Sequence, residues 1–492
     1  MSLSVLAVVR AVVVTAAGAG LVVAATRVPG VVAVGAVVGA PSSAQASSSP
    51  VHGASLECPG PELVGVPGLR DLPVGVRVAA ATAPLAALAS TQPVATPGTL
   101  TLTGMPGASL AAPGTQRGRQ VAANLTAGQG AEASATQSLA PGLAAAQSWL
   151  VTSGDQRSLG SVPCVRPAAD QWLLAGGSAP GRQERLVLTN PGGNPVTVDV
   201  TLHGPSGPIS SSIGKSLVVP AHGRAAFLLD SISGSITSPA VHVVTQGGLV
   251  GAVVNDTWLN GTQPGGSDDA SPSAAPSRDQ IIPAVDVKGL AVLRVVVPGS
   301  GEAVVQARVL TRLGPRALPS GGVSRVPGGT VRDIDLSGLP AGASALQVRS
   351  DQPVVASAIF VRAGKQSLDF AWAVSTPPIT TVAGMPFSDP AGVTHRLDLT
   401  ASTGSATAEV ITVTAAGGEH AQKVSVPTDG TVSVAIPAQT SSVWVMPVSG
   451  PGQLRAGVDS WIDDHTGTLI TSTPLLDSAL RTTTVGVRQT LE

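Results

Sequence analysis

The stretch GLVGAVVNDTWLNGT, residues 248–262, joins small and branched apolar residues to Asp256-Thr257-Trp258 and closes with Asn-Gly. Related phrases occur as GLAAAQSWLVTSG at 142–154 and as RAGVDSWIDDHTG at 455–467. An Asn-Gly pair after an apolar run is typical of a turn that ends a strand. A large ring at such a place most often packs against the end of an aliphatic core. The recurrence therefore predicts a repeated structural unit and not a single active site.

The tryptophans give the length of the repeat. Trp149, Trp258, Trp372 and Trp461 follow one another at intervals of roughly 90–115 residues, the length of a β-sandwich domain. Trp372, in SLDFAWAV, lacks the preceding Ser or Thr of the other three. The intervals are too long for a propeller blade or a solenoid turn. We interpret the four residues as structural repeat tryptophans that close a core in each unit.

Other phrases repeat upstream of the tryptophans. They are LVVPAHGRAAFLLD (217–230), SRVPGGTVRDIDL (324–336) and KVSVPTDGTVSVAI (423–436). In each, a proline-containing turn closed by glycine separates two runs of alternating apolar and polar residues, the pattern of half-buried strands. The sequence therefore predicts an all-β protein: tandem antiparallel immunoglobulin-like β-sandwich modules behind an N-terminal hydrophobic helix.

Composition refines this organisation. Aromatic residues are only 2% of the chain and Tyr is absent, so the cores must be built from Val, Leu and Ala. The segment QPGGSDDASPSAAPSRD (263–279) is predicted to be a flexible loop. The first unit is degenerate, because RVAAATAPLAALAS (77–90) is rich in Ala and could form a short helix. The predicted parts are a signal peptide or membrane anchor (1–46), a linker (47–57), a degenerate N-terminal β module (58–155), three sandwiches (160–275, 281–378 and 380–478) and a C-terminal tail (479–492).

The N-terminal region carries a targeting signal. Arg10 precedes the uncharged run AVVVTAAGAGLVVAAT (11–26), and Ala44-Gln45-Ala46 fits the small-x-small pattern of a signal-peptidase site. A retained anchor needs ~20 apolar residues, and residues 11–40 supply them only with Arg27 in their midst. The chain is thus predicted to be extracytoplasmic, either secreted after cleavage or held by a single membrane pass.

Cysteine usage agrees with export. The chain has two cysteines, Cys58 and Cys164. In an exported protein such a pair usually forms one disulfide; the alternative is two unpaired buried thiols. We expect the disulfide.

The sequence contains no recognisable catalytic, cofactor or metal site. The seven His are scattered, without an HExxH motif or a second cysteine pair. The segment IGKS (213–216) lacks the first glycine of a P-loop, since Ile209 stands there, and GPSGP (204–208) lacks the last glycine of a nucleophile elbow. A net charge of -1 argues against nucleic-acid binding, which requires a basic surface.

One acidic cluster offers a metal-binding alternative. The segment DSWIDDHTG places Asp459, Asp463, Asp464 and His465 close together in the sequence, where they could bind a cation. The other interpretation, which we favour, is a solvated turn after the last strand.

The segment CVRPAADQWLLAGGSAPGRQERLVLTNPGGNPVTVDVTLHGPSG (164–207) resembles a family of uncharacterised proteins exported by actinobacteria. The resemblance includes CPGPELVGVPGLRDLP (58–73) and RAGVDSW (455–461). It implies a secreted or membrane-linked β-rich protein of the cell envelope. It carries over no activity, because the family has none that is established.

We therefore expect a non-enzymatic envelope protein that acts as a scaffold or as a protein or glycan interaction module. Its partner would be an envelope protein or a cell-wall glycan, with the membrane as a further partner if the leader is uncleaved. One alternative is a carbohydrate-binding or adhesion protein, which would expose coplanar tryptophans. Another is a diverged secreted enzyme, which would hold at least two convergent acidic or His side chains in a concave pocket.

Overall fold

In the computed structural model the stretch 248–262 contains strand β16 (Gly251–Asn260). This strand pairs antiparallel with β10 (Arg182–Asn190) on one side and β17 (Gln263–Ala270) on the other. The structure describes residues 47–484 except 63–74, 90, 127, 210, 235, 320, 340–341 and 366. The predicted hydrophobic helix and the signal-peptidase site lie outside these residues. Within them, we find no helix with the length and apolar character needed to cross a membrane.

The described chain confirms the all-β, antiparallel prediction. Its strands form four pairs of packed sheets, which we call the N-terminal, first, second and third sandwiches (residues 53–163, 170–270, 277–374 and 382–474). Each has an inner sheet of four strands that ends in β8, β17, β25 or β33, and an outer sheet packed against it.

The strands of the N-terminal sandwich are β2 (Gly53–Cys58), β6 (Gly130–Thr136) and β4 (Leu100–Met105) outside, and β5 (Gln120–Leu125), β3 (Val76–Thr82), β7 (Leu143–Val151) and β8 (Ser158–Pro163) inside. Those of the first are β12 (Gly207–Ile209), β11 (Val196–Gly204), β13 (Leu217–Val219), β15 (Ala240–Gln246) and β9 (Asp170–Leu173) outside, and β14 (Gly223–Leu228), β10, β16 and β17 inside. A short helix, α2 (Leu229–Ser233), follows β14.

The outer sheet of the second sandwich contains β18 (Ser277–Val287), β20 (Ala303–Thr311), β21 (Gly314–Ala317) and β22 (Val323–Val326), and the inner one β23 (Val331–Asp335), β19 (Ala291–Val296) and β25 (Leu368–Val374). The long strand β24 (Gly342–Ala363) belongs to both sheets. The third sandwich has β29 (Glu419–Val426), β28 (Ala406–Thr414), β31 (Thr440–Ser449), β26 (Val382–Pro386) and β34 (Asp477–Ser478) outside, and β30 (Gly430–Ile436), β27 (Thr394–Ser402), β32 (Gln453–Asp463) and β33 (Thr468–Pro474) inside. Strands β1 (Ser47–Pro50) and β35 (Arg481–Thr484) pair with each other, and two short 3₁₀ helices span Leu85–Leu88 and Gln137–Leu139.

The sandwich cores follow from the alternation of residues along the strands. In β11, Val196, Val198 and Val200 are buried while Thr197 and Asp199 point away from the core. The cores consist mainly of Val, Leu, Ile and Ala, as the scarcity of aromatic residues requires. The three proline-containing phrases are strand–turn–strand segments, and each passes from an outer sheet to an inner one.

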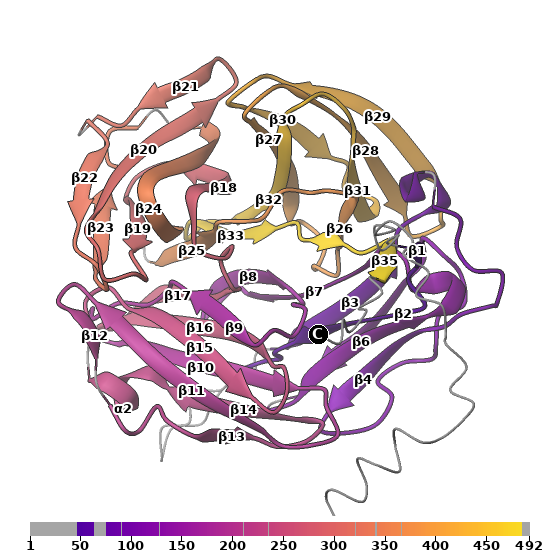
Figure 1. The fold of residues 1–492 in the computed structure, drawn as a ribbon, viewed down its shortest axis with the longest axis horizontal. Helices are drawn as coiled ribbons and strands as arrows, with labels where there is room; N and C mark the ends of the chain where they lie inside the picture. Colours follow the sequence, from indigo (N-terminus) through magenta and orange to yellow (C-terminus); the bar gives the residue numbers. More distant parts are fainter. Residues whose placement is uncertain are drawn as a thin grey trace, which may run out of the picture. The chain divides into compact units, whose positions relative to one another are not determined.

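Strands β8, β17, β25 and β33 lie where the four sandwiches meet (Figure 1). Each of these four central strands contacts its two neighbours in the circuit β8–β17–β25–β33–β8, and β8 also contacts β25. The third sandwich thus meets the N-terminal one, and contacts near the chain ends reinforce this meeting. Val51 N donates to Leu480 O (3.1 Å), and Ser478 Oγ donates to Leu143 O (2.8 Å). The segment Ser48–Thr482 is one compact unit, so a chain that begins at Ser47 retains all these contacts.

Side chains on the central strands form hydrogen bonds to other strands of the circuit. Asp268 of β17 accepts hydrogen bonds from Trp372 N of β25 (2.7 Å) and Thr471 Oγ1 of β33 (3.1 Å). Asp369 of β25 accepts one from Ile470 N of β33 (2.7 Å), and Thr471 Oγ1 accepts one from Ser161 N of β8 (3.0 Å). Burial raises the pKa of Asp268 and Asp369 well above the usual range of a carboxyl. These acids supply acceptors to buried backbone N–H groups that have no partner in their own sheets.

The predicted flexible loop 263–279 is wrong, because residues 263–270 form β17 and residues from 277 onward form β18. The glycines that suggested a loop allow close packing instead. A Cβ at Gly265 would lie 2.6 Å from Trp258 O, and one at Gly266, whose φ is +103°, would lie 2.3 Å from Asp369 Oδ1. Glycine in a strand often marks such a close approach.

A buried carboxyl lies between the N-terminal and first sandwiches. Glu57 of β2 is fully buried, and neither of its carboxyl oxygens has a hydrogen-bond partner among the described residues. Its Cβ lies only 2.8 Å from where a Cβ on Gly251 of β16 would be. Burial, with the charge of the paired Glu132, raises the pKa of Glu57 to about 9. Glu57 is therefore protonated at neutral pH.

Replacing Asp268 should show how strongly the central strands depend on their acids. We expect Asp268→Ala to lower the unfolding free energy by about 2–4 kcal/mol, because it leaves the buried Trp372 N–H unpaired and opens a cavity. Denaturant unfolding of residues 47–492 under non-reducing conditions measures the change. Asp155→Ala, at an exposed position, is the control. Equal stability of the two variants would contradict the role given to Asp268.

Glu57→Gln should remove a pH dependence of stability. Between the unfolded pKa of 4.5 and the folded value of about 9, the folded chain holds a proton that the unfolded chain releases, so stability falls as pH rises. The limiting slope is about 1.4 kcal/mol per pH unit. We expect the unfolding free energy to fall less between pH 5 and pH 8 in Glu57→Gln than in the natural chain. The exposed control Glu419→Gln should behave like the natural chain, and a Glu57→Gln variant that does so too would refute the assignment.

Candidate binding site

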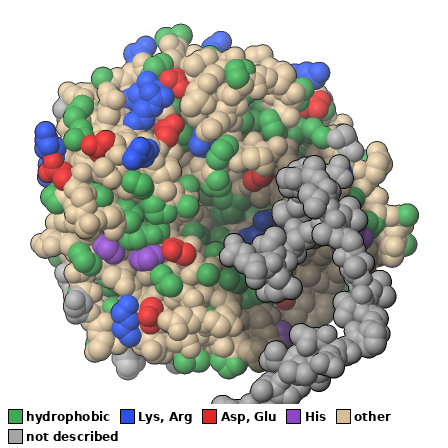
Figure 2. Space-filling model, viewed as in Figure 1, with side chains coloured by type: hydrophobic (Ala, Val, Ile, Leu, Met, Phe, Trp, Pro, Cys, Tyr) green, Lys and Arg blue, Asp and Glu red, His purple; other side chains and the backbone are tan. Residues whose placement is uncertain are grey.

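The segments that join the sandwiches line one hollow. Its lining comes from residues 163–168, 272–276, 377–380 and 476–478, which follow the four central strands in turn, and from the neighbouring sheets. Its volume of about 770 Å³ is within the ~300–1,000 Å³ typical of small-molecule sites. Hydrophobic side chains gather round a depression near the middle of the face drawn in Figure 2. The N-terminal, first and third sandwiches line the hollow directly, and the second is joined to it by the connections at its two ends, 272–276 and 377–380.

Prolines explain why these segments leave the sheets where they do. Pro163, Pro272, Pro276, Pro377 and Pro378 all line the hollow. Proline has no N–H to donate to a strand ladder and fixes an extended or turn conformation. The connections after β8, β17 and β25 therefore leave their sheets in an extended form and present apolar ring surfaces to the hollow.

The disulfide fixes one of these segments. Cys58 of β2 and Cys164 are bonded, as predicted, and both are buried. Beside them, Glu57 N donates to Val165 O (2.7 Å) and Val165 N donates to Glu57 O (2.8 Å). The segment 163–168 is thereby held against the outer sheet of the N-terminal sandwich. The disulfide is consistent with an extracytoplasmic protein.

The polar residues of the hollow differ in whether they have partners. Asp170 is 3.0 Å from His242 Nε2, and the His242 ring stacks on Trp172 with centroids 4.2 Å apart. Asp477 accepts hydrogen bonds from Thr381 N (3.1 Å) and from the hydroxyls of Thr380 and Thr381. Arg166 is exposed and has no ion pair or hydrogen bond to any residue that the structure describes. Its guanidinium is thus available to a ligand.

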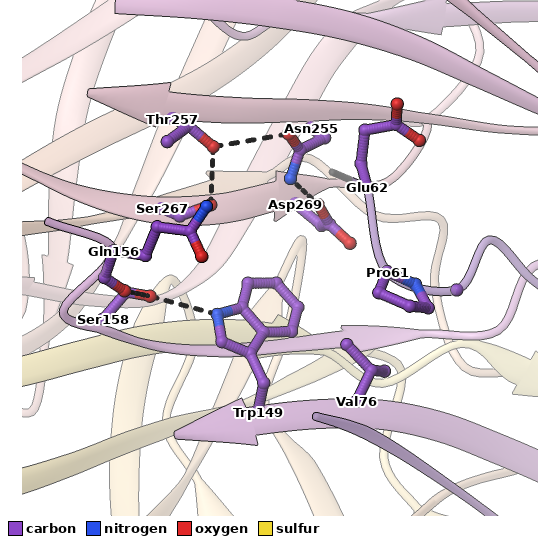
Figure 3. Close-up of a pocket in the computed structure, with 11 residues that line it drawn as sticks. Pro61, Glu62, Val76, Trp149, Gln156, Ser158, Asn255, Thr257, Ser267 and Asp269 are labelled. Carbon is purple, nitrogen blue, oxygen red and sulfur yellow. Dashed lines mark hydrogen bonds between the residues drawn. The ribbon is translucent and has the colours of Figure 1, made fainter. Parts of the chain in front are cut away.

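A second, smaller pocket lies between the N-terminal and first sandwiches (Figure 3). Its volume of about 20 Å³ is room for about one water. The Trp149 ring forms one wall and donates to Ser158 Oγ (3.2 Å). Asp269 accepts from Asn255 Nδ2 (2.9 Å) and Gln147 Nε2 (3.1 Å), and burial raises its pKa to about 7 against these hydrogen bonds. Because both carboxyl oxygens of Asp269 already accept hydrogen bonds, this residue joins the two sandwiches and is not free to bind a ligand.

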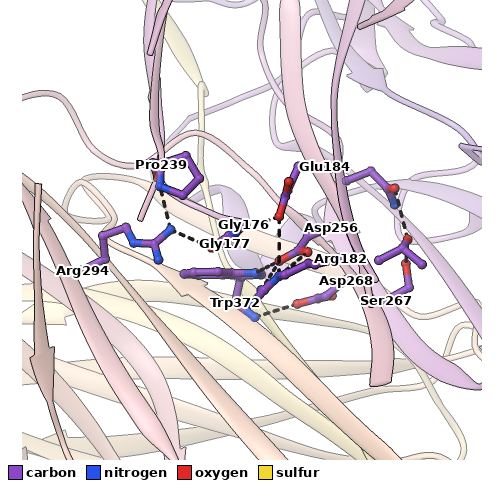
Figure 4. Close-up of polar contacts among 12 residues, drawn as sticks. Gly176, Gly177, Arg182, Glu184, Pro239, Asp256, Ser267, Asp268, Arg294 and Trp372 are labelled. Atoms are coloured by element: carbon purple, nitrogen blue, oxygen red, sulfur yellow. Dashed lines mark hydrogen bonds and ion pairs between the residues drawn. The ribbon is translucent and has the colours of Figure 1, made fainter. Parts of the chain in front are cut away.

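The densest polar network joins the first and second sandwiches (Figure 4). The ring of Trp372 has the guanidinium carbons of Arg182 and Arg294 at 5.9 and 5.2 Å from its centroid. Its Nε1 donates to Asp256 Oδ2 (2.8 Å), which also pairs with Arg182. Arg294 Nη1 donates to the carbonyls of Gly176 (2.9 Å) and Pro239 (3.1 Å). These groups satisfy one another, so the network is a joint and offers no free group to a ligand.

The four tryptophans do not occupy equivalent places. Trp149 on β7 packs in the core of its own sandwich, and Trp258 on β16 packs against its own. Trp461 on β32 packs against the core of the second sandwich, because it lies three residues from the core residue Val458 and so on the opposite face. Trp372 is on β25, the fourth strand, and packs into the core of the first sandwich. The interpretation of one core-closing tryptophan per unit is therefore wrong for Trp372 and Trp461.

The acidic cluster after β32 is divided by the structure. Asp459 is buried and pairs with Arg396, whereas Asp463 accepts from Thr468 Oγ1 (2.5 Å). Asp464 pairs with Arg157 of the N-terminal sandwich (2.8 Å) and accepts from Thr466 N (2.8 Å). In the described part of the chain, no group of three or more His, Cys, Asp and Glu is arranged to hold a metal ion.

Sequence reasoning missed the residues of the hollow. Arg166, Trp172 and Ala275 belong to no recognisable motif. Ala275 lies about 100 residues after the other two, so the sequence does not show that they are neighbours. One signal was present: a proline-containing segment such as 163–168, 272–276 or 377–380 precedes each of the three later sandwiches. The regular spacing of these segments could have predicted that each lies at one end of its unit. It could not have predicted that they meet at one site.

Comparison with known proteins gives a family but no activity. The family described as "Family of unknown function (DUF5719)" matches residues 112–437. The chain belongs to this family. No curated protein matches it. Among solved structures it is similar to the "Crystal Structure of Thermotoga maritima 1070", with 15% identity, a TM-score of 0.18, and coverage of 20% of this chain and 93% of that one.

Proposed function

We propose that this protein is a non-enzymatic, extracytoplasmic binding protein of the cell envelope, and that the hollow is its ligand site. In this proposal its four sandwiches are copies of one immunoglobulin-like unit, joined at the predicted boundaries. The observation that carries the proposal is that the connections of all four sandwiches line one hollow. A scaffold of independent modules has no need of such convergence, whereas a binding site built by the whole unit does.

The polar groups of the hollow favour binding over catalysis. The carboxylate of Asp170 is paired with His242, and that of Asp477 accepts from two threonines. The sulfur of Cys164, which also lines the hollow, is in the disulfide and is not a free nucleophile. The walls are mostly Leu, Ala and Pro, whose side chains can bind an apolar ligand but have no catalytic groups.

Two observations bear on the glycan-binding alternative. Trp149 and Trp372 are buried, and Trp258 and Trp461 are only partly exposed, each with an arginine over its ring. Because the rings are buried or partly covered and are distributed over three cores, they do not form a shared platform for sugar rings. The hollow therefore supports the proposal better than the tryptophans do.

Filling the hollow should abolish binding. Ala275 is exposed within it, so Ala275→Phe adds bulk with little effect on the cores. We expect a fraction of envelope extract to raise the melting temperature of residues 47–492, because a ligand that binds only the folded state stabilises it. The increase should vanish in Ala275→Phe and persist in Ala317→Phe, a matched change at an exposed position of β21. An increase of equal size in both variants would exclude the hollow as the site.

A further inference from the structure

We propose that the ligand of the hollow is a long-chain carboxylate, with its apolar chain inside and its single negative charge on Arg166. This inference rests on the proposed function and adds the chemical class of the ligand. It is drawn from the lining of the hollow and from the charges at its edge.

The walls select an apolar chain. Leu56, Leu143 and Ala144 line the hollow from the N-terminal sandwich, Trp172 from the first, and Leu476 from the end of the third. The prolines at 272, 276, 377 and 378 add ring surfaces between them. Donors and acceptors are few here. Gln171 Nε2 already donates to Val250 O (2.9 Å) and Ala168 O (3.3 Å), whereas Gln171 Oε1 and Ser273 Oγ are buried without a partner among the described residues. A polar ligand such as a sugar would leave most of its hydroxyls unpaired against this lining.

Of the described residues that line the hollow, Arg166 supplies one free cation. Most arginines near the joints between sandwiches are ion-paired, as Arg157, Arg224 and Arg294 are. Arg166 differs, since it is exposed and has no partner among the described residues. A guanidinium presents donors in a fork that matches the two oxygens of a carboxylate. The head group of the ligand is therefore an anion.

The neighbouring acids limit that anion to one charge. Asp170 and Asp477 also line the hollow, and their hydrogen-bond donors come from His242, Thr380 and Thr381. Their negative charges remain near any ligand and repel a dianionic phosphate monoester more than a carboxylate. Among the described residues, one free guanidinium in a lining that also holds two hydrogen-bonded carboxylates thus favours a monoanion.

Three probes of the same chain length separate these contributions. Dodecanoate, dodecanol and dodecyl phosphate are titrated into residues 47–492 at pH 8, below their micelle concentrations, with the fluorescence of the tryptophans and calorimetry as readouts. We expect dodecanoate to bind about tenfold more tightly than either of the others, as a charge-assisted bidentate contact allows.

Two pairs of variants test the assignment of residues. Arg166→Ala should weaken dodecanoate binding about tenfold and leave dodecanol binding within about twofold, because only the charged contact is lost. Arg278→Ala, at an exposed arginine without an ion pair, should change neither. Ala275→Phe should weaken all three probes, and Ala317→Phe none of them. Thermal unfolding confirms that each variant is folded.

Several outcomes would overturn the inference. Dodecanol binding as tight as dodecanoate, tighter binding of dodecyl phosphate, or equal behaviour of Arg166→Ala and Arg278→Ala each contradicts the monoanionic head. If no probe binds but an envelope fraction still stabilises the chain in a way that Ala275→Phe abolishes, the inference fails and the proposed function stands. If the fraction also has no effect, or acts equally on Ala275→Phe, both fail.

Discussion

The unit depends on how backbone groups are satisfied where its four inner sheets meet. Trp372 N and Ile470 N lie in central strands whose next neighbour belongs to another sandwich, and each donates to a buried carboxyl of the preceding strand in the circuit. An unpaired buried N–H costs about 1–3 kcal/mol. Each of these acids removes that cost for one N–H and so stabilises the interface between two sandwiches. The raised pKa values of Asp268 and Asp369 show the opposing cost of placing carboxyls where water is absent.

The central circuit also explains the position of the hollow. Once β8, β17, β25 and β33 are packed against one another, the segments that follow them leave at the same place. Prolines keep the first three of these segments out of the sheets, whereas Asp477–Ser478 in the fourth forms β34. The disulfide and the Glu57–Val165 backbone pair hold the first segment in position. Apolar residues such as Leu143 and Trp172 line the space that the sandwiches share. The hollow is thus a result of ring-like packing and not of any one module.

The sequence predicted the strands well because their pattern is local. The alternation in β11 and the proline-containing turns before β14, β23 and β30 depend on neighbours within a few residues, and these were interpreted correctly. Local patterns failed in β17, whose Gly265-Gly266-Ser267-Asp268-Asp269 has the composition of a loop. Gly265 packs on Trp258 of the neighbouring strand β16, whereas Gly266 and Asp268 are explained by Asp369 and Trp372, contacts that only the packing of two sandwiches creates. The site is less predictable for the same reason, since no segment of it contains a motif.

Trp372 and Trp461, which do not pack in the core of their own sandwich, show how similar units differ in their contacts. Trp149 and Trp258 complete a core of aliphatic residues, which any sandwich of this composition requires. Trp372 and Trp461 face away from their own cores and place their rings beside arginines in the joint with the preceding sandwich. A tryptophan ring can pack on the aliphatic part of an arginine side chain and attract its guanidinium over the ring face. Such a contact suits an interface that is both apolar and charged. The residue type is shared, but its use is set by the face of the strand on which it lies, and this face decides whether it supports one sandwich or joins two.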